Sequence, residues 1–464
     1  MNDIWEEDHN LIMELEEKDI NSNKSSNNID DMIIFQNDEI LIHSDEKISF
    51  LGISNDSQLS IIINIVCSAI GGSCFNFPFI IEKLGLPLTL VIFILVMISV
   101  YYTIDLLRSF IIDTKFFSLT LLIEKTIGTN WMKVYVISSL IFFISIEINY
   151  ISEIFTIISK LIGISVKEDY FKTIVYFILT ILFEIVICFY LSNLKKIHII
   201  SFFSIIFFIV ILISVIVLGF INLASDKEKL SYENLIATGT DNNLDLFFFI
   251  NSYSIIFIYG FSFHSSLPIL LKNTKQLDSK NSKNAQIISF IIIGISYLLI
   301  TFFGYLVKSD VPEILFINDE SLESTVFQII LKIIICLFEF SVISLRFIVI
   351  RDNYINLFWV KRLNFMCDLN ITYLIILFCN VVAYFTNEKN LGFNIISNFM
   401  QLFGGIFGVF ICYALPIIIY SNVNGTRNTK SIIGYFLAGI FLIMGIVSIC
   451  HSVYDIIHSN DYLN

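Results

Sequence analysis

The chain has 464 residues, of which 56% are hydrophobic and only 15% are charged, and its mean hydropathy is +0.81. This composition leaves too few polar side chains to cover a water-soluble domain, so it excludes that class and predicts an all-α integral membrane protein. The net charge is −13, and residues 1–57 carry most of it, with fifteen Asp or Glu against three Lys. An acidic segment repels nucleic acid and anionic lipid headgroups, which excludes both as partners of this segment.

The first 57 residues predict a disordered cytosolic tail. They are acidic and include an Asn/Ser-rich run at residues 21–28, a composition that cannot bury enough apolar surface to fold. No secretory signal peptide opens the chain, because the first long apolar stretch follows this segment. A solvated leader is favoured over a docking or sorting segment, and both readings stay open. Residues 58–464 are expected to form the transmembrane domain.

Apolar runs of spanning length predict about eleven transmembrane helices in that domain. They are expected near residues 60–82, 86–110, 131–160, 171–191, 197–221, 244–271, 284–307, 323–349, 369–386, 393–420 and 431–456. Segments on the N-terminal side of the membrane carry nineteen Lys or Arg and those on the opposite side carry eight. The positive-inside rule therefore places the N-terminus in the cytosol.

Two of these spans, the first and the sixth, contain helix-breaking runs at the same relative position in each half of the domain. Residues 71–78 read Gly-Gly-Ser-Cys-Phe-Asn-Phe-Pro, and residues 260–268 read Gly-Phe-Ser-Phe-His-Ser-Ser-Leu-Pro. Hydrocarbon cannot satisfy exposed backbone N–H and C=O groups, so such breaks survive where they line a cavity or a bound solute. Matched breaks favour an inverted repeat with a substrate site at the midplane, and they predict that residues 71–75 and 260–265 are non-helical and close together.

The chemistry of these breaks suits a zwitterion. Unpaired N–H groups and a positive helix dipole favour a carboxylate beside the first break, and freed carbonyls of the second favour an ammonium group. The alternative is a packing kink repaired by neighbouring helices. An apolar wall is expected from aromatic residues, and His264 either relays a proton or hydrogen-bonds the freed backbone. The candidate residues at the breaks are Gly71, Gly72, Ser73, Cys74, Phe75, Tyr259, Gly260, Phe261, Phe263 and His264.

Ionisable residues inside the third and eighth spans are functional candidates, because such groups are costly in a membrane. The third span has Glu147 and Glu153, and pairing of Glu147 or of Glu184 with a buried cation is favoured over proton coupling. In the eighth span, Lys332, Glu339 and Arg346 recur every seven residues. They form one stripe that is expected to face the protein interior, with Glu339 and Lys332 finding opposite charges or polar partners. Snorkelling of Arg346 to the inner interface is the alternative.

Several of these residues resemble a known family. The run from Gly71 to Phe79, followed by Glu82-Lys83-Leu84-Gly85, resembles the first helix of the amino acid/auxin permease family. The run Phe263-His264-Ser265-Ser266-Leu267-Pro268-Ile269 is similar to the signature of its sixth helix, and Arg351-Asp352 after the eighth span fits as well. The resemblance extends from residue 60 to about 450.

What this resemblance implies is a LeuT-like fold and secondary active transport of amino acids. Repeat one would cover about 60–221 and repeat two about 244–420, as a 5+5 inverted repeat with discontinuous helices 1 and 6, and the final helix, about 431–456, would be appended. The third helix borders the substrate site in this fold, which makes Tyr150 a candidate for contacting the solute. Ser73 departs from the usual glycine. Cys67 stands where sodium-coupled branches carry Asn, and Arg346 is a candidate to replace the ion.

Other chemistries find little support in the sequence. The six His and eight Cys show no metal-binding spacing, no phosphate-binding loop indicates an ATPase, and no cofactor is expected, so an enzyme is disfavoured. Expected partners are a free amino acid and protons. A non-transporting amino acid sensor that signals through the acidic tail stays open, as do the amino acid, the coupling ion and residence in a plasma or vacuolar membrane.

Overall fold

The computed structural model describes residues 49–50, 53–54, 58–161, 170–191, 197–225, 242–272, 279–307, 326–357, 365–388 and 401–458. Two short strands, β1 (Ser49–Phe50) and β2 (Ile53–Ser54), pair antiparallel, with Ser49 opposite Ser54 and Phe50 opposite Ile53. This pair lies inside the segment expected to be structureless. The rest of the predicted tail, including the acidic residues 1–48, lies outside the described residues.

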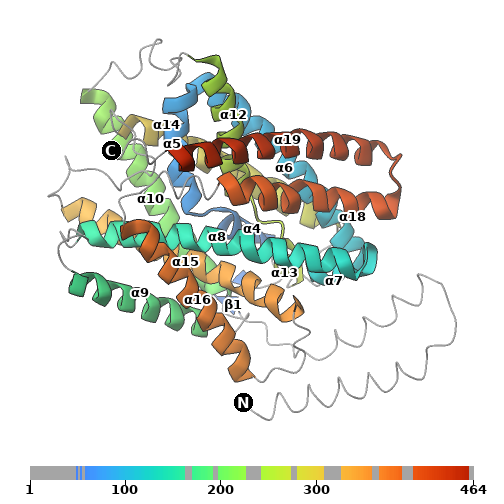
Figure 1. Cartoon of the computed structure of the whole chain (residues 1–464), viewed down its shortest axis with the longest axis horizontal. Coiled ribbons are helices and arrows are strands. Elements are labelled where there is room, and N and C mark those ends of the chain that lie inside the picture. Colours follow the sequence, from blue (N-terminus) through green and yellow to red (C-terminus); the bar gives the residue numbers. More distant parts are fainter. Residues whose placement is uncertain are drawn as a thin grey trace. The chain divides into compact units, whose positions relative to one another are not determined.

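All other described elements are helices, as the apolar composition predicts (Figure 1). A helix satisfies its own backbone hydrogen bonds, which hydrocarbon cannot do. The first group comprises α4 (Gln58–Ala69), the 3-10 helix η1 (Gly72–Asn76), α5 (Phe77–Leu84), α6 (Leu86–Thr114), α7 (Leu119–Thr126), α8 (Thr129–Leu161), α9 (Tyr170–Leu191) and α10 (Ile197–Ser225). The second group comprises α12 (Asn243–Gly260), α13 (Leu267–Lys272), α14 (Ser279–Val307), α15 (Val326–Leu357), α16 (Phe365–Glu388), the π-helical turns η4 (Gly404–Gly408) and η5 (Phe410–Ala414), α18 (Leu415–Asn424) and α19 (Thr429–His458).

Fewer spans meet the criteria of length and composition than the eleven expected. Eight helices in the described part of the chain are long and apolar enough to cross a membrane, and the bent pair Gln58–Ala69 and Gly72–Leu84 makes nine. Two further predicted spans coincide with α9 and α16, whose apolar stretches, Ile174–Val186 and Ile371–Tyr384, are shorter. The short helix α7 was not expected.

Helix packing follows a recurring pattern. Numbering the eleven expected spans in chain order, span 5 (α10) packs on span 7 (α14), and span 10 (α18) packs on span 2 (α6). Span 4 (α9) packs on span 8 (α15), and span 9 (α16) packs on span 3 (α8). The broken spans cross-pack, α4 with α13 and α5 with α12, and α8 packs on α15. Each contact therefore has a counterpart five spans along, while α19 lies beside α12 and α18 (Figure 1).

Candidate substrate site

The first break separates α4 from η1. Residues 70–71 are non-helical, and Gly71 has an extended backbone with φ −143° and ψ 177°. The chain then makes one 3-10 turn and continues into α5, and the two halves of the span are bent by 55°. The expected break exists, but the expectation that all of residues 71–75 are non-helical was wrong, because Gly72, Ser73, Cys74 and Phe75 belong to η1. A 3-10 turn keeps part of the backbone hydrogen-bonded, which shortens the unsatisfied stretch.

The second break is longer. Gly260 is the last residue of α12, and α13 begins at Leu267, so residues 261–266 form turns between two helices. The break therefore begins one residue later than expected. Turn hydrogen bonds satisfy some of the backbone N–H and C=O groups of this break. One example is the bond that the N–H of Ser266 donates to the carbonyl of Phe263, at 3.0 Å. This span therefore has six residues outside regular helix, against two in the first.

One side chain joins the two breaks. The hydroxyl oxygen of Tyr297, in α14, lies 2.8 Å from the carbonyl oxygen of Ala69 and 2.9 Å from that of Gly260. These carbonyls end α4 and α12, where the helical hydrogen-bond pattern stops. A hydroxyl group carries a single proton, so it can donate fully to only one of the two carbonyls at a time. Both breaks therefore meet at the Tyr297 hydroxyl group. This group faces two carbonyl acceptors but has one proton to donate.

The surroundings of the first break are polar and charged. The guanidinium carbon of Arg346, in α15, lies 4.8 Å from the ring centre of Tyr150, in α8. A Cβ atom added to Gly71 would lie 2.2 Å from the Tyr150 hydroxyl oxygen and 2.8 Å from Nη2 of Arg346. One added to Gly72 would lie 3.0 Å from Oε2 of Glu153. The glycine pair thus lets a tyrosine, a cation and a carboxyl group approach the broken backbone.

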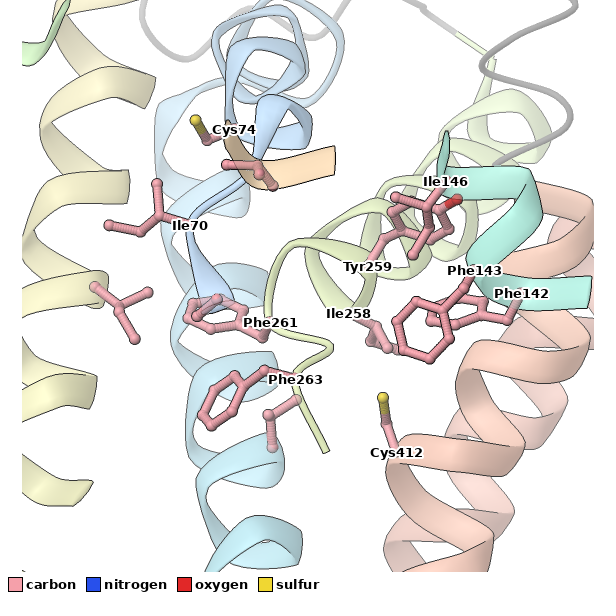
Figure 2. Close-up of a cluster of buried hydrophobic side chains, with 14 of the residues drawn as sticks. Ile70, Cys74, Phe142, Phe143, Ile146, Ile258, Tyr259, Phe261, Phe263 and Cys412 are labelled. Atoms are coloured by element: carbon pink, nitrogen blue, oxygen red, sulfur yellow. The ribbon is translucent and has the colours of Figure 1, made fainter. Parts of the chain in front are cut away.

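The surroundings of the second break are aromatic. The ring of Phe261 packs against Phe93, Tyr297 and Phe290, with ring centres 5.2–6.4 Å apart. Phe263 packs on Phe290 at 5.7 Å. Figure 2 shows Phe261 and Phe263 on the second break, Ile70 on the neighbouring first break, and Tyr259 beside Phe142, Phe143 and Ile146 of α8. These rings are buried and form an apolar wall.

Two polar contacts interrupt this wall. Nε2 of His264 lies 3.0 Å from the hydroxyl oxygen of Thr103, in α6. The hydroxyl oxygen of Tyr259 lies 3.2 Å from that of Ser145, in α8. This contact of His264 is neither of the two roles expected for it, because its partner is a side chain of α6 and not the freed backbone; it ties the break to a neighbouring helix.

In the described part of the chain, the buried side chains include more carboxyl groups than cations. Glu147, Glu153, Glu184 and Glu339 are all at most 1% exposed, whereas Arg346 is the cation buried among them. The ion pairs found in the described residues are Lys83–Glu82 and Arg108–Asp105, so none involves these four carboxyl groups.

Two of the four carboxyl groups contact side-chain amides. Oε2 of Glu184 accepts a hydrogen bond from Asn380 at 2.7 Å, and Oε1 of Glu153 accepts one from Asn149 at 2.8 Å. The cation expected for Glu184 is therefore replaced by an amide. Glu147 interacts electrostatically with Arg346 from beyond ion-pair distance.

The expected stripe on α15 turns inward in part. Glu339 is fully buried, Arg346 is 6% exposed, and Lys332 is half-buried. Arg346 reaches the first break, which argues against snorkelling to the interface. Glu339 meets the carboxyl group of Glu153. Glu339 was expected to find an opposite charge or a polar partner, and the polar group facing it across the α8–α15 contact is a second carboxyl group.

Sequence reasoning missed Tyr297 and the meeting of Glu153 with Glu339. Tyr297 lies in an apolar span with no Gly or Pro beside it, in a chain with 20 Tyr and 46 Phe. Nothing in its local sequence separates it from a packing residue. Glu153 stood out as an ionisable residue in a span, but its partner lies on a helix far along the chain.

The sequence model of a family described as transmembrane amino acid transporter protein matches residues 54–458, which cover both breaks and all described helices. The chain belongs to this family. It is therefore an integral membrane protein of a transporter family and not an enzyme. No curated protein matches the chain.

A solved structure gives the fold. The crystal structure of the Eremococcus coleocola manganese transporter, in complex with an aromatic bis-isothiourea substituted compound, superposes with a TM-score of 0.54 at 12% identity. The match covers 88% of this chain and 90% of that one. At this identity the likeness shows the fold alone, which is LeuT-like. In the described part of this family member, no group of three or more His, Cys, Asp or Glu side chains is placed to hold a metal ion.

Proposed function

We propose that the chain is a secondary transporter that moves free amino acids across a membrane by alternating access. The observation that carries this proposal is the Tyr297 hydroxyl within hydrogen-bonding distance of the last carbonyl of both broken helices. Convergent breaks supply unsatisfied backbone groups to a solute, which is the feature that a midplane substrate site requires. Family membership supplies the substrate class.

The proposed architecture is eleven spans in a 5+5 inverted repeat, with α19 appended. Two shorter apolar helices, α9 and α16, add to the nine spans that meet the length criterion. The helix contacts that recur five spans along the chain support the repeat, because two copies of one fold related by a pseudo-twofold axis must repeat their contacts. The Lys and Arg distribution supports a cytosolic N-terminus. The family resemblance allows a plasma or a vacuolar membrane.

The substrate is held by its charged ends at the breaks. The ammonium group binds the carbonyls of Ala69 and Gly260, where it offers three donors in place of the single proton of Tyr297. The carboxylate binds at the first break, beside Arg346 and Tyr150. The buried hydroxyl of Ser73 has no hydrogen-bond partner among the described residues, which makes it a further donor. The side chain of the amino acid faces the apolar wall of the second break.

Transport is driven by protons or by the substrate gradient and does not require sodium. Cys67 is buried in α4 with its thiol beside Ser201 and Ser204 of α10, and a thiol is a poor ligand for a hard cation. Arg346 places a fixed positive charge at the first break, where an added sodium ion would be repelled.

Reconstitution into proteoliposomes tests the proposal. Uptake of a panel of labelled amino acids is measured under imposed pH and sodium gradients, with manganese as a competing solute. We expect accumulation of at least one amino acid when choline replaces sodium, and no competition by manganese. Complete loss of accumulation without sodium would contradict the proposal that transport does not require sodium. Amino acid binding without flux would show that the protein is a sensor and not a carrier.

A further inference from the structure

We propose that Glu153 and Glu339 share one proton and form the proton-binding site that couples the two halves of the transporter. The inference rests on the proposed function, since coupling has meaning only in a carrier. Glu153 belongs to α8 in the first half and Glu339 to α15 in the second half. Both are buried, and their carboxyl groups are within hydrogen-bonding reach of each other.

The two carboxyl groups lack donors. Oε1 of Glu153 accepts from Asn149, whereas Oε2 of Glu153 and both oxygens of Glu339 find no donor among the described residues. Two carboxylates in contact inside a protein repel each other strongly, because the low dielectric scarcely screens them. One proton removes this repulsion and turns one carboxyl group into the donor that the other lacks. A shared proton is therefore the simplest way to satisfy the pair.

Among the described residues, no cation forms an ion pair with either carboxyl group of the pair. In the part of the chain that the structure describes, the titratable groups that interact electrostatically with the pair are Cys74 from η1, Cys336 from α15 and Tyr150 from α8. Arg346 lies two helical turns from Glu339, over the ring of Tyr150, and forms no ion pair with the four buried acids in the described part of the chain. The positive charge of Arg346 thus lies at the first break, and a proton neutralises the pair of Glu153 and Glu339.

The position of the pair links its proton to movement. Helices α8 and α15 belong to opposite halves and pack directly on each other. With the proton bound, a hydrogen bond draws the two helices together. After its loss, two like charges push them apart. Oε2 of Glu153 also lies where a side chain on Gly72 would be, so the pair abuts the first break. Substrate binding there and proton binding at the pair therefore bias the same interface.

The test compares three variants of the full chain in proteoliposomes. Glu153→Gln and Glu339→Gln each keep the shape of a protonated carboxyl group but cannot release a proton. Glu184→Gln is the matched control, because Glu184 is equally buried and bonded to Asn380 outside this pair. Three quantities are measured: accumulation of labelled amino acid driven by a pH gradient, exchange of labelled for unlabelled amino acid, and the protonated-carboxyl infrared band of the pair, resolved from the bands of the other buried acids, Glu147 and Glu184.

We expect Glu153→Gln and Glu339→Gln to lose proton-driven accumulation and the infrared band while exchange persists, and Glu184→Gln to keep all three. Accumulation that survives in both pair variants would overturn the inference, as would a band that only Glu184→Gln removes. If the wild type transports amino acids without any response to pH and lacks the band, the proton pair fails and amino acid transport stands. If no amino acid is taken up or exchanged but the pair variants remove the band, transport fails and the pair stands.

Discussion

The two helix breaks differ in length and in chemistry. The first has two non-helical residues and a 3-10 turn, against which Tyr150, Arg346 and Glu153 press. The second has six residues and is lined by the rings of Phe93, Phe290 and Tyr297. A free amino acid carries two opposite charges on one carbon and a variable side chain on the same carbon. We therefore expect the carboxylate to be recognised at the short break and the side chain at the long one, with the ammonium group between them at the carbonyls of Ala69 and Gly260.

Glycine at the short break makes the charged contacts possible, so Gly71→Ala is expected to have the largest effect. The added Cβ would lie 2.2 Å from the Tyr150 hydroxyl oxygen, in a backbone conformation that any residue adopts, so the cost is steric. Overpacking of this kind costs about 1–3 kcal/mol and displaces Tyr150. We expect uptake of every amino acid to be abolished.

The control for this substitution is Gly439→Ala in α19, where an added Cβ meets nothing within 4 Å. The double variant Gly71→Ala with Tyr150→Phe removes the closest contact and is expected to recover thermal stability measured in detergent. Equal uptake by Gly71→Ala and Gly439→Ala would show that the first break tolerates a side chain and that Gly71 is not needed for the charged contacts.

Arg346→Gln tests the charge at the short break. Removing the guanidinium takes away the buried cation beside Tyr150 and Glu147, so binding of the carboxylate weakens for all amino acids alike. A charged hydrogen bond of this kind is worth about 1.5–3 kcal/mol, which corresponds to a ten- to hundredfold rise in KM. Uptake kinetics with a small and a large apolar amino acid provide the measurement. A changed ratio between the two substrates would contradict the assignment, and the exposed Arg427→Gln is the control.

Sequence alone identified the breaks because Gly71, Gly72 and Gly260 carry a local signal for interrupted helix. It placed the boundaries within a few residues and put Glu339 and Arg346 on an inward stripe. It could not identify Tyr297, since an aromatic residue in an apolar span reads as packing, or the partner of Glu153, since that contact joins residues 186 positions apart. Local periodicity reports which face of a helix is buried and contains no information on which distant helix covers it.

Tyr297→Phe tests the point where the two breaks meet, because the hydroxyl group of Tyr297 lies between them. Its loss removes the one hydroxyl donor that the two carbonyls share, which costs about 1–3 kcal/mol of stability in the empty protein. If the ammonium group takes the same carbonyls, saturating amino acid raises the unfolding temperature more in this variant than in the wild type. The control is Tyr413→Phe, which also loses a buried hydroxyl contact, at 2.8 Å from Ser99, outside both breaks. An equal substrate-induced shift in both variants would remove Tyr297 from the site.

Phe263→Leu is expected to have the smallest effect and to act on selectivity. Phe263 is fully buried on the long break and packs on Phe290. A shorter side chain opens space in the apolar wall, and differences of about one methylene in an apolar pocket are worth about 1–3 kcal/mol. Preference should therefore move toward larger amino acids, while the uptake of small ones changes little. Competition between large and small amino acids for uptake measures this ratio.

Phe441→Leu is the control. It truncates a ring in α19 that stacks on Tyr413 at 4.2 Å, so it should leave the ratio unchanged. A uniform loss across all amino acids with Phe263→Leu, like that expected for Arg346→Gln, would show that the long break does not recognise the side chain of the substrate.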